Sequence, residues 1–137
     1  MDKTFQAIQI LNKLNNQNYE FCIYGEVNSE QDYIDNVKFI SGRNENNGAI
    51  FSETQPYSWT QIQAQFTTAE FNLAMEDLRV TRNILLAQSD WTQFNDSPLT
   101  DAKKTEWATY RTSLRNLTNG LTTVAEVRAV TWPTKPE

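Results

Sequence analysis

The sequence predicts an α+β protein: an N-terminal helix and a small antiparallel sheet, followed by a long helical hairpin and an extended C-terminal tail. Short apolar runs with a two-residue period between residues 19 and 52 indicate strands. Apolar residues spaced by three and four from residue 58 onward indicate helices. At 137 residues the chain has the length of one domain. We expect two parts, an acidic α/β head at residues 1–57 and a helical hairpin domain at residues 58–137.

The head is predicted to begin with an amphipathic helix over residues 2–15, which Asp2 or Thr4 could cap. Alternation in YEFCIYG, residues 19–25, and in YIDNVKFIS, residues 33–41, predicts two strands of an antiparallel hairpin. AIFS at residues 49–52 could add a third strand. The single cysteine, Cys22, has no basic neighbour in sequence to lower its pKa, which favours an inert packing role over a nucleophile.

Two helices are predicted in the hairpin domain. A capping box formed by Ser58 and Gln61 starts the first helix, which runs to about residue 88 with an allowed break at residues 66–68. Thr100 is the predicted N-cap of the second helix, and Gly120 its left-handed C-terminal cap. The tail VRAVTWPTKPE contains two prolines and is predicted to lie extended across the hairpin through Val130 and Trp132.

Composition excludes several classes of function. The formal charge of −5 argues against nonspecific binding to nucleic acid, which depends on clustered Lys and Arg. Charge is uneven: residues 1–78 hold four basic and eleven acidic residues, giving −7, and residues 79–137 hold eight and six, giving +2. Two solvated faces explain this most simply, and attraction within a monomer or between copies is the alternative. No run of about 20 apolar residues predicts a membrane span, and no signal peptide pattern is present.

The residue types needed for catalysis and metal binding are sparse. Histidine is absent, which removes the commonest general base and metal ligand, and one cysteine cannot build a thiolate zinc site. Asp90, Asp96 and Asp101 lack the close spacing and the Gly turn of a calcium loop. We therefore expect no enzyme, no catalytic, cofactor-binding or metal-binding residues, and no cofactor. The lone cysteine is consistent with intracellular folding.

The connection between the two helices, SDWTQFNDSPLT at residues 89–100, contains aromatic residues in a polar, turn-rich stretch. Connections of this length need side chains that fix them. Trp91 is the predicted anchor, and Arg82 is expected to form a bidentate bond across the hairpin with an aspartate of the connection or of the next helix's first turn, Asp90, Asp96 or Asp101. An aromatic platform for single-stranded nucleic acid or sugar is the alternative use of the tryptophans, but the acidic surroundings of Trp91 favour a local core.

The segment RNILLAQSDWTQFNDSPLTDAKKTEWATYRTSLRNL, followed by TWPTKP, resembles the phage tail assembly chaperone-like family. Its pattern joins RNxLLxxSDWT, PLT, WxxYRxxLR and a terminal WPxxP, and their arrival together at these intervals makes the resemblance specific. The matching positions are Arg82, Asn83, Leu85, Leu86, Ser89, Asp90, Trp91, Thr92, Asp96, Pro98, Leu99, Thr100, Lys104, Trp107, Tyr110, Arg111, Leu114, Arg115, Trp132, Pro133 and Pro136. We expect these residues to serve structure.

The resemblance implies a non-enzymatic protein of phage tail morphogenesis that acts by protein–protein contact. It implies either a chaperone of tail or tail-fibre assembly or a structural component of the tail, baseplate or fibre. Expected partners are phage tail, baseplate or fibre proteins, self-association is compatible with this role, and neither nucleic acid nor membrane is expected. The expected location is the host cytoplasm during assembly, with retention in the virion tail as the alternative. Another class remains open, a small phage-encoded regulatory or host-interaction protein with an acidic binding head. Phe94 matches no position of the family pattern and is the candidate partner contact.

Overall fold

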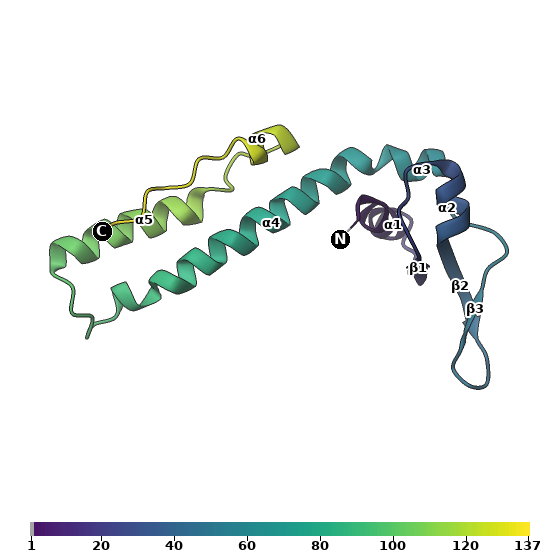
Figure 1. Cartoon of the computed structure of the whole chain (residues 1–137), viewed down its shortest axis with the longest axis horizontal. Coiled ribbons are helices and arrows are strands. Elements are labelled where there is room, and N and C mark those ends of the chain that lie inside the picture. Colours follow the sequence, from purple (N-terminus) through teal and green to yellow (C-terminus); the bar gives the residue numbers. More distant parts are fainter. Residues whose placement is uncertain (1) are drawn as a thin grey trace. The chain divides into compact units, whose positions relative to one another are not determined.

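The structure is a computed structural model that describes residues 2–137. A helix and a small antiparallel sheet come first along the chain and longer helices follow (Figure 1), which confirms the predicted α+β class. The backbone forms two compact units, Met1–Glu70 and Phe71–Glu137. The predicted boundary after residue 57 falls inside the first unit.

The first unit contains the predicted N-terminal helix and sheet. Helix α1 (Lys3–Leu14) follows the N-cap residue Asp2, whose side chain makes no cap hydrogen bond, while Thr4 is fully buried. Strands β1 (Phe21–Ile23), β2 (Val37–Arg43) and β3 (Ala49–Phe51) form an antiparallel sheet in the order β1-β2-β3. AIFS therefore does supply the third strand.

Helix α2 (Glu30–Asn36) occupies the first half of the segment predicted as the second strand, so that part of the prediction was wrong. Ser29 caps the helix, because its Oγ accepts a hydrogen bond from the backbone N–H of Asp32 at 3.1 Å. Strand β2 begins only at Val37. The alternation of apolar residues in YIDNVKF also fits a short helix whose Tyr33 faces the core, followed by a strand with Val37 and Phe39 inward.

The main helical segment is divided at Gln65 into α3 (Trp59–Ala64) and α4 (Phe66–Ser89), so the helix is broken as the sequence allowed, one residue before the predicted range of 66–68. The predicted capping box is present: the backbone N–H of Gln61 donates to Ser58 Oγ at 3.2 Å, and the backbone N–H of Ser58 donates to Gln61 Oε1 at 2.8 Å. Ile62 and Ala69 are fully buried in the core that α1 and the sheet share. This packing is the reason that the first unit extends to Glu70.

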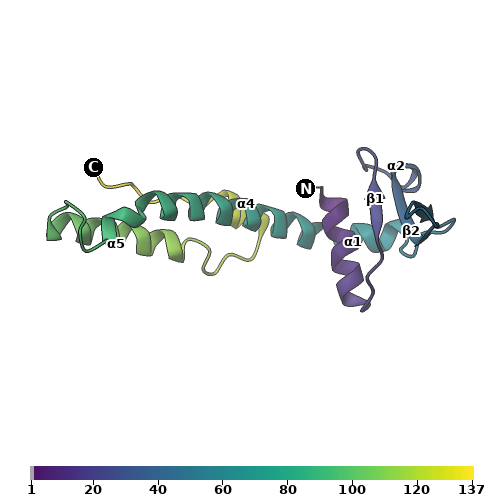
Figure 2. The same ribbon diagram turned by 90° about the horizontal axis from the view of Figure 1, so that it is seen from below.

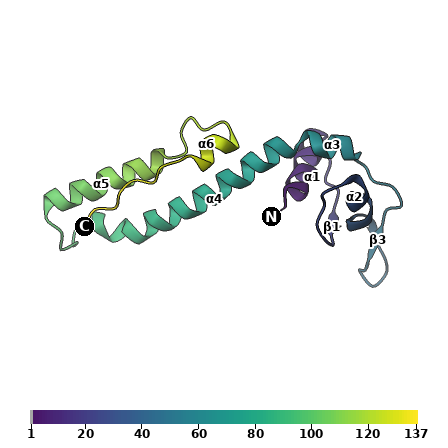
Figure 3. The same cartoon turned by 45° about the horizontal axis from the view of Figure 1, so that its top comes forward.

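The second unit contains the rest of α4, the 3-10 helix η1 (Asp90–Gln93), α5 (Asp101–Asn116) and α6 (Val124–Arg128). Helices α4 and α5 run side by side as a hairpin, and the C-terminal segment returns along them (Figures 2 and 3). Thr100 Oγ1 accepts from the Lys103 N–H at 3.2 Å, which confirms the predicted N-cap. Gly120 has the predicted left-handed conformation, with φ of 77°, but α5 ends at Asn116 with Leu117 as its C-cap, so Gly120 lies in the turn beyond the helix and is not its cap. The prediction that the tail is extended was wrong for residues 127 and 128. These two residues end α6, which begins at the capping box of Thr123 and Glu126.

Two buried phenols in the first unit lead to a prediction for alkaline pH. Burial raises the pKa of Tyr33 above its ordinary value of 10.0, and nearby Tyr57 raises it further. Burial likewise raises the pKa of Tyr57. A group whose pKa is higher in the folded state than in the unfolded state contributes to stability. That contribution is fully present at pH values below the unfolded-state pKa and is lost as pH rises toward the folded-state pKa. The free energy of unfolding should therefore fall steadily above about pH 10.

Urea denaturation at a series of pH values, with phenolate absorbance recorded in parallel, measures this loss. The Tyr33→Phe variant removes one titrating phenol and should show a shallower decline with pH, although it also loses the hydrogen bond that Tyr33 Oη donates to the carbonyl of Tyr57 at 2.7 Å. An unchanged slope in this variant would contradict the assignment to Tyr33.

Candidate functional site

The connection between α4 and α5, residues 89–100, is held by its own polar side chains. Thr92 in η1 is fully buried, and its Oγ1 donates to the carbonyl of Ser89 at 2.6 Å. Gln93 Nε2 donates to Thr92 Oγ1 at 3.1 Å and to the carbonyl of Lys104 at 3.2 Å. These bonds join η1 to both the end of α4 and the start of α5, so this part of the connection has a defined conformation.

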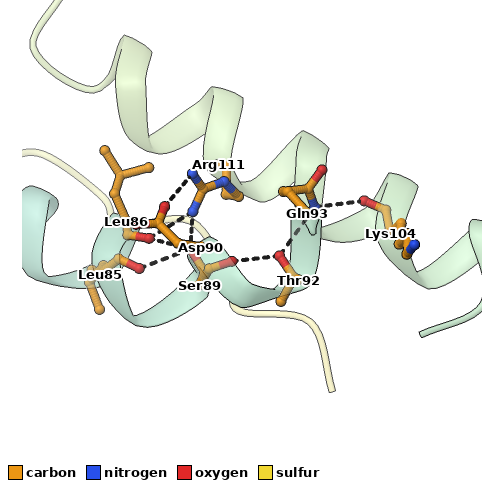
Figure 4. A network of polar contacts seen from close by, with 8 residues as sticks. All are labelled: Leu85, Leu86, Ser89, Asp90, Thr92, Gln93, Lys104 and Arg111. Atoms are coloured by element: carbon orange, nitrogen blue, oxygen red, sulfur yellow. Dashed lines mark hydrogen bonds and ion pairs between the residues drawn. The ribbon is translucent and has the colours of Figure 1, made fainter. Parts of the chain in front are cut away.

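Arg111 of α5 ties the C-terminal end of α4 to the connection (Figure 4). Its side chain is 9% exposed. Nη1 donates to the carbonyl of Leu86 and to Ser89 Oγ, and Nη2 donates to Asp90 Oδ1, each at 2.7 Å. The last carbonyls of a helix have no partner within the helix, and its C-terminal end favours a positive charge. Arg111 therefore caps α4 from the neighbouring helix while it pairs with Asp90.

Arg82 does not form the predicted bond with an aspartate. Its guanidinium donates to the side-chain oxygen of Asn83 at 3.1 and 3.2 Å and to Thr118 Oγ1 at 3.5 Å. Because the two helices are antiparallel, Arg82 lies beside the end of α5, two turns of α4 away from Asp90. The bridge across the hairpin exists, but Arg111 makes it. Among residues 2–137, the side chains of Asp96 and Asp101 form no ion pair.

The tryptophans of the motif occupy different environments. Trp107 is 6% exposed and packs edge to face on Tyr110, with ring centroids 5.7 Å apart, beside the fully buried Leu114. Trp91 lies with its ring centroid 6.2 Å from that of Trp107, but 45% of it is exposed, so it is not the buried anchor that the sequence predicted. Thr92, the next residue, takes the buried place. Trp132 is also on the surface, 36% exposed.

The remaining predicted site residues are divided between the interior and the surface. Leu86 is half-buried against the core of Trp107 and Tyr110, and Arg82 and Pro133 are also half-buried. The exposed members are Asn83, Asp90, Asp96, Pro98, Thr100 and Arg115. Phe94, the candidate partner contact, is 57% exposed immediately after η1.

Beside Trp91 and Trp107 lies a small cavity of about 100 Å³. It is lined by Leu85, Gln88, Ser89, Trp91, Trp107, Tyr110 and Lys135. Lys135 Nζ stands 5.8 Å from the centroid of the Trp107 ring, which places this part of the C-terminal tail against α5. The lining carries one positive charge and no carboxylate.

No cluster of three or more His, Cys, Asp or Glu side chains in residues 2–137 is arranged to hold a metal ion. Over the same range, none of the helices combines the length and the apolar character that crossing a bilayer requires.

A known protein family matches part of this chain. The family model described as phage tail assembly chaperone protein matches residues 75–137. This range takes in most of α4, the whole connection, α5, α6 and the tail, and it leaves the first unit unmatched. No curated protein and no solved structure matches the chain.

Proposed function

We propose that this chain, whose residues 75–137 match the family model described as phage tail assembly chaperone protein, assists tail assembly by holding another tail protein against the connection between α4 and α5. The observation that carries this proposal is a fixed connection that presents aromatic side chains to solvent. Phe94 is 57% exposed and Trp91 45% exposed, three residues apart, on a segment held from inside by Thr92 and Arg111.

The geometry suits recognition of a protein surface. Aromatic side chains supply much of the binding energy at protein interfaces, because each contributes a large contact area. A segment that is already fixed before binding loses little conformational entropy when it binds. The polar groups of the connection bond to one another, with Arg111 on Ser89 and Asp90 and with Thr92 on Ser89, which supports a structural role for them in a non-enzymatic protein.

The finer role that we propose is that of a chaperone which binds a tail or tail-fibre subunit in the host cytoplasm and leaves before the particle is complete. A structural component of the tail, baseplate or fibre would instead remain in the virion. Quantitative mass spectrometry of purified particles separates the two. Absence of the chain from particles supports the departing chaperone, and stoichiometric presence overturns it.

Loss of the Phe94 ring should weaken binding of the tail protein, which we call the client, without unfolding the chain. We expect Phe94→Ser to lower recovery of the tail protein about tenfold in affinity capture from cells that express the tail genes, because exposed aromatic anchors dominate such interfaces. Captured proteins are identified by mass spectrometry, and circular dichroism checks that the melting temperature is unchanged.

Tyr24→Ser is the matched control, since Tyr24 is an aromatic residue of the first unit that is 65% exposed. Equal recovery of the tail protein with the Phe94 and Tyr24 variants would show that the connection is not the site that binds it. Recovery of a host protein with no tail protein by the unmodified chain would favour the regulatory or host-interaction role.

A further inference from the structure

After α6 the chain continues as residues 130–137, which form neither helix nor strand and which we call the proline segment. It runs from α6 back along α4 and α5 (Figures 1 and 3). Val130, Pro133 and Pro136 are half-buried, while the residues between them are exposed. A polyproline II helix has three residues per turn, so side chains three positions apart lie on one side of it. The proline segment therefore packs on the hairpin with the single face that this conformation provides.

The sequence of the proline segment favours this conformation before it packs. A proline ring fixes its own φ at about −65°, and it pushes the residue before it into the extended region. Trp132 and Lys135 precede the two prolines, so both are restricted in this way. A segment that is extended in advance loses little conformational entropy on binding, and proline residues three apart are typical of peptides that dock on aromatic-lined grooves. PTKP at residues 133–136 has this spacing.

The surface on which the proline segment ends is aromatic. The cavity of about 100 Å³ is lined by Leu85 of α4, Trp91 of η1, and Trp107 and Tyr110 of α5, and Lys135 completes the lining. We call this cavity the aromatic pocket. The ammonium group of Lys135, 5.8 Å from the centroid of the Trp107 ring, is close enough for cation–π attraction. The chain thus contains both an aromatic pocket and a proline-containing ligand for it.

Few interactions hold the proline segment in place. Within residues 2–137, residues 131–137 take part in no hydrogen bond and no ion pair. Lys135 is exposed, and Trp132 is 36% exposed. The rest of the pocket lining is fixed independently of the segment, because Arg111 Nη1 donates to Ser89 Oγ at 2.7 Å at the end of α4. The proline segment can therefore leave while the other walls of the aromatic pocket stay in place.

We propose that the aromatic pocket binds extended segments with two prolines three residues apart and a cationic residue between them. The chain's own proline segment occupies the pocket until the client presents a segment of this kind, so the two compete. This inference rests on the proposed client binding at the connection, because Trp91 both lines the pocket and forms part of the exposed aromatic surface near Phe94. Binding to the pocket can nevertheless be measured without the client.

A synthetic peptide with the sequence VTWPTKPE, which reproduces the proline segment, tests the pocket on the isotope-labelled full chain. In the Lys135→Ser variant the chain's own segment has lost its contact with Trp107. The peptide should therefore bind this variant about tenfold more tightly than the unmodified chain, because less of the pocket is occupied. The indole resonances of Trp91 and Trp107 should shift on binding, and that of Trp59 in the first unit should not. The control peptide carries serine in place of lysine and should bind about tenfold more weakly.

Capture of the client tests the competition. Lys135→Ser should raise recovery of the tail protein about threefold, because a larger fraction of the chain has an open pocket. Lys13→Ser is the matched control, since Lys13 is an exposed lysine of α1 in the first unit, and it should leave recovery unchanged. Circular dichroism confirms that both variants fold.

The outcomes separate this inference from the proposed function. Resonances of Trp91 and Trp107 that stay unchanged in Lys135→Ser at about millimolar peptide would overturn the pocket. Unchanged or lower client recovery in Lys135→Ser, with Phe94→Ser still lowering recovery, would overturn the competition and leave the proposed client site standing. If the unmodified chain captures no tail protein, the proposed function fails, and the peptide titration still decides the pocket. Shifts of the two resonances with protein concentration alone would mean that a second copy's proline segment fills the pocket, which would overturn occupation from within the chain.

Discussion

Replacing Trp107 with alanine is expected to lower the free energy of unfolding of the second unit by about 3–5 kcal/mol, the loss typical of a large aromatic residue removed from a core. Trp107 is 6% exposed and its ring contacts those of both Tyr110 and Trp91. Its removal leaves a cavity between the two helices of the hairpin, beside the fully buried Leu114. Urea denaturation followed by circular dichroism gives the free energy.

Trp91→Ala provides the comparison within the same pair of rings. Because 45% of Trp91 is exposed in the folded chain, its removal should cost only about 1–2 kcal/mol. Losses of equal size in the two variants would contradict the different burial of the two residues. A loss of client capture in Trp91→Ala, with little change in stability, would add Trp91 to the contact surface around Phe94.

Features that depend on a few neighbouring residues were predictable from the sequence. The capping box at Ser58 and Gln61, the N-cap Thr100 and the left-handed Gly120 are each set by local backbone geometry, and the structure contains all three. Equally local signals at Ser29 and Thr123 precede the helices α2 and α6. They were missed because a two-residue apolar period and nearby prolines favoured extended structure over helices of one or two turns.

Features that depend on how the two helices align could not be read from spacing alone. Arg82 and Arg111 both lie near the connection in sequence terms, and only the antiparallel alignment decides that Arg111 reaches Ser89 and Asp90. The burial of Trp91 and Thr92 depends on the path of η1, which places the small hydroxyl inside and the large ring at the surface. Hydrophobicity alone predicts the reverse order.

Arg111→Met is expected to lower the free energy of unfolding of the second unit by about 2–4 kcal/mol, because it keeps the length of the side chain and removes all its donors. The carbonyl of Leu86 and the hydroxyl of Ser89 then lose their charged partner at a buried helix end. The stability of the Arg111→Lys variant should fall between those of the unmodified chain and the Arg111→Met variant, since an ammonium group keeps the charge but cannot reproduce the planar arrangement of donors. Urea denaturation measures the three chains side by side.

The Asp90→Asn variant shows whether the ion pair of Arg111 or its cap on α4 contributes more to stability. The side chain of Asp90 is 52% exposed and remains hydrated when its charge is removed, so this change should cost less than about 1 kcal/mol. A cost as large as that of Arg111→Met would mean that the ion pair, rather than the cap on α4, stabilises the connection. If the cap dominates, hydrogen exchange at the backbone of Thr92 should accelerate in Arg111→Met and change little in Asp90→Asn, because only the first variant releases the end of α4 from α5. Client capture should then fall in the same order, since a mobile connection loses more entropy when it binds.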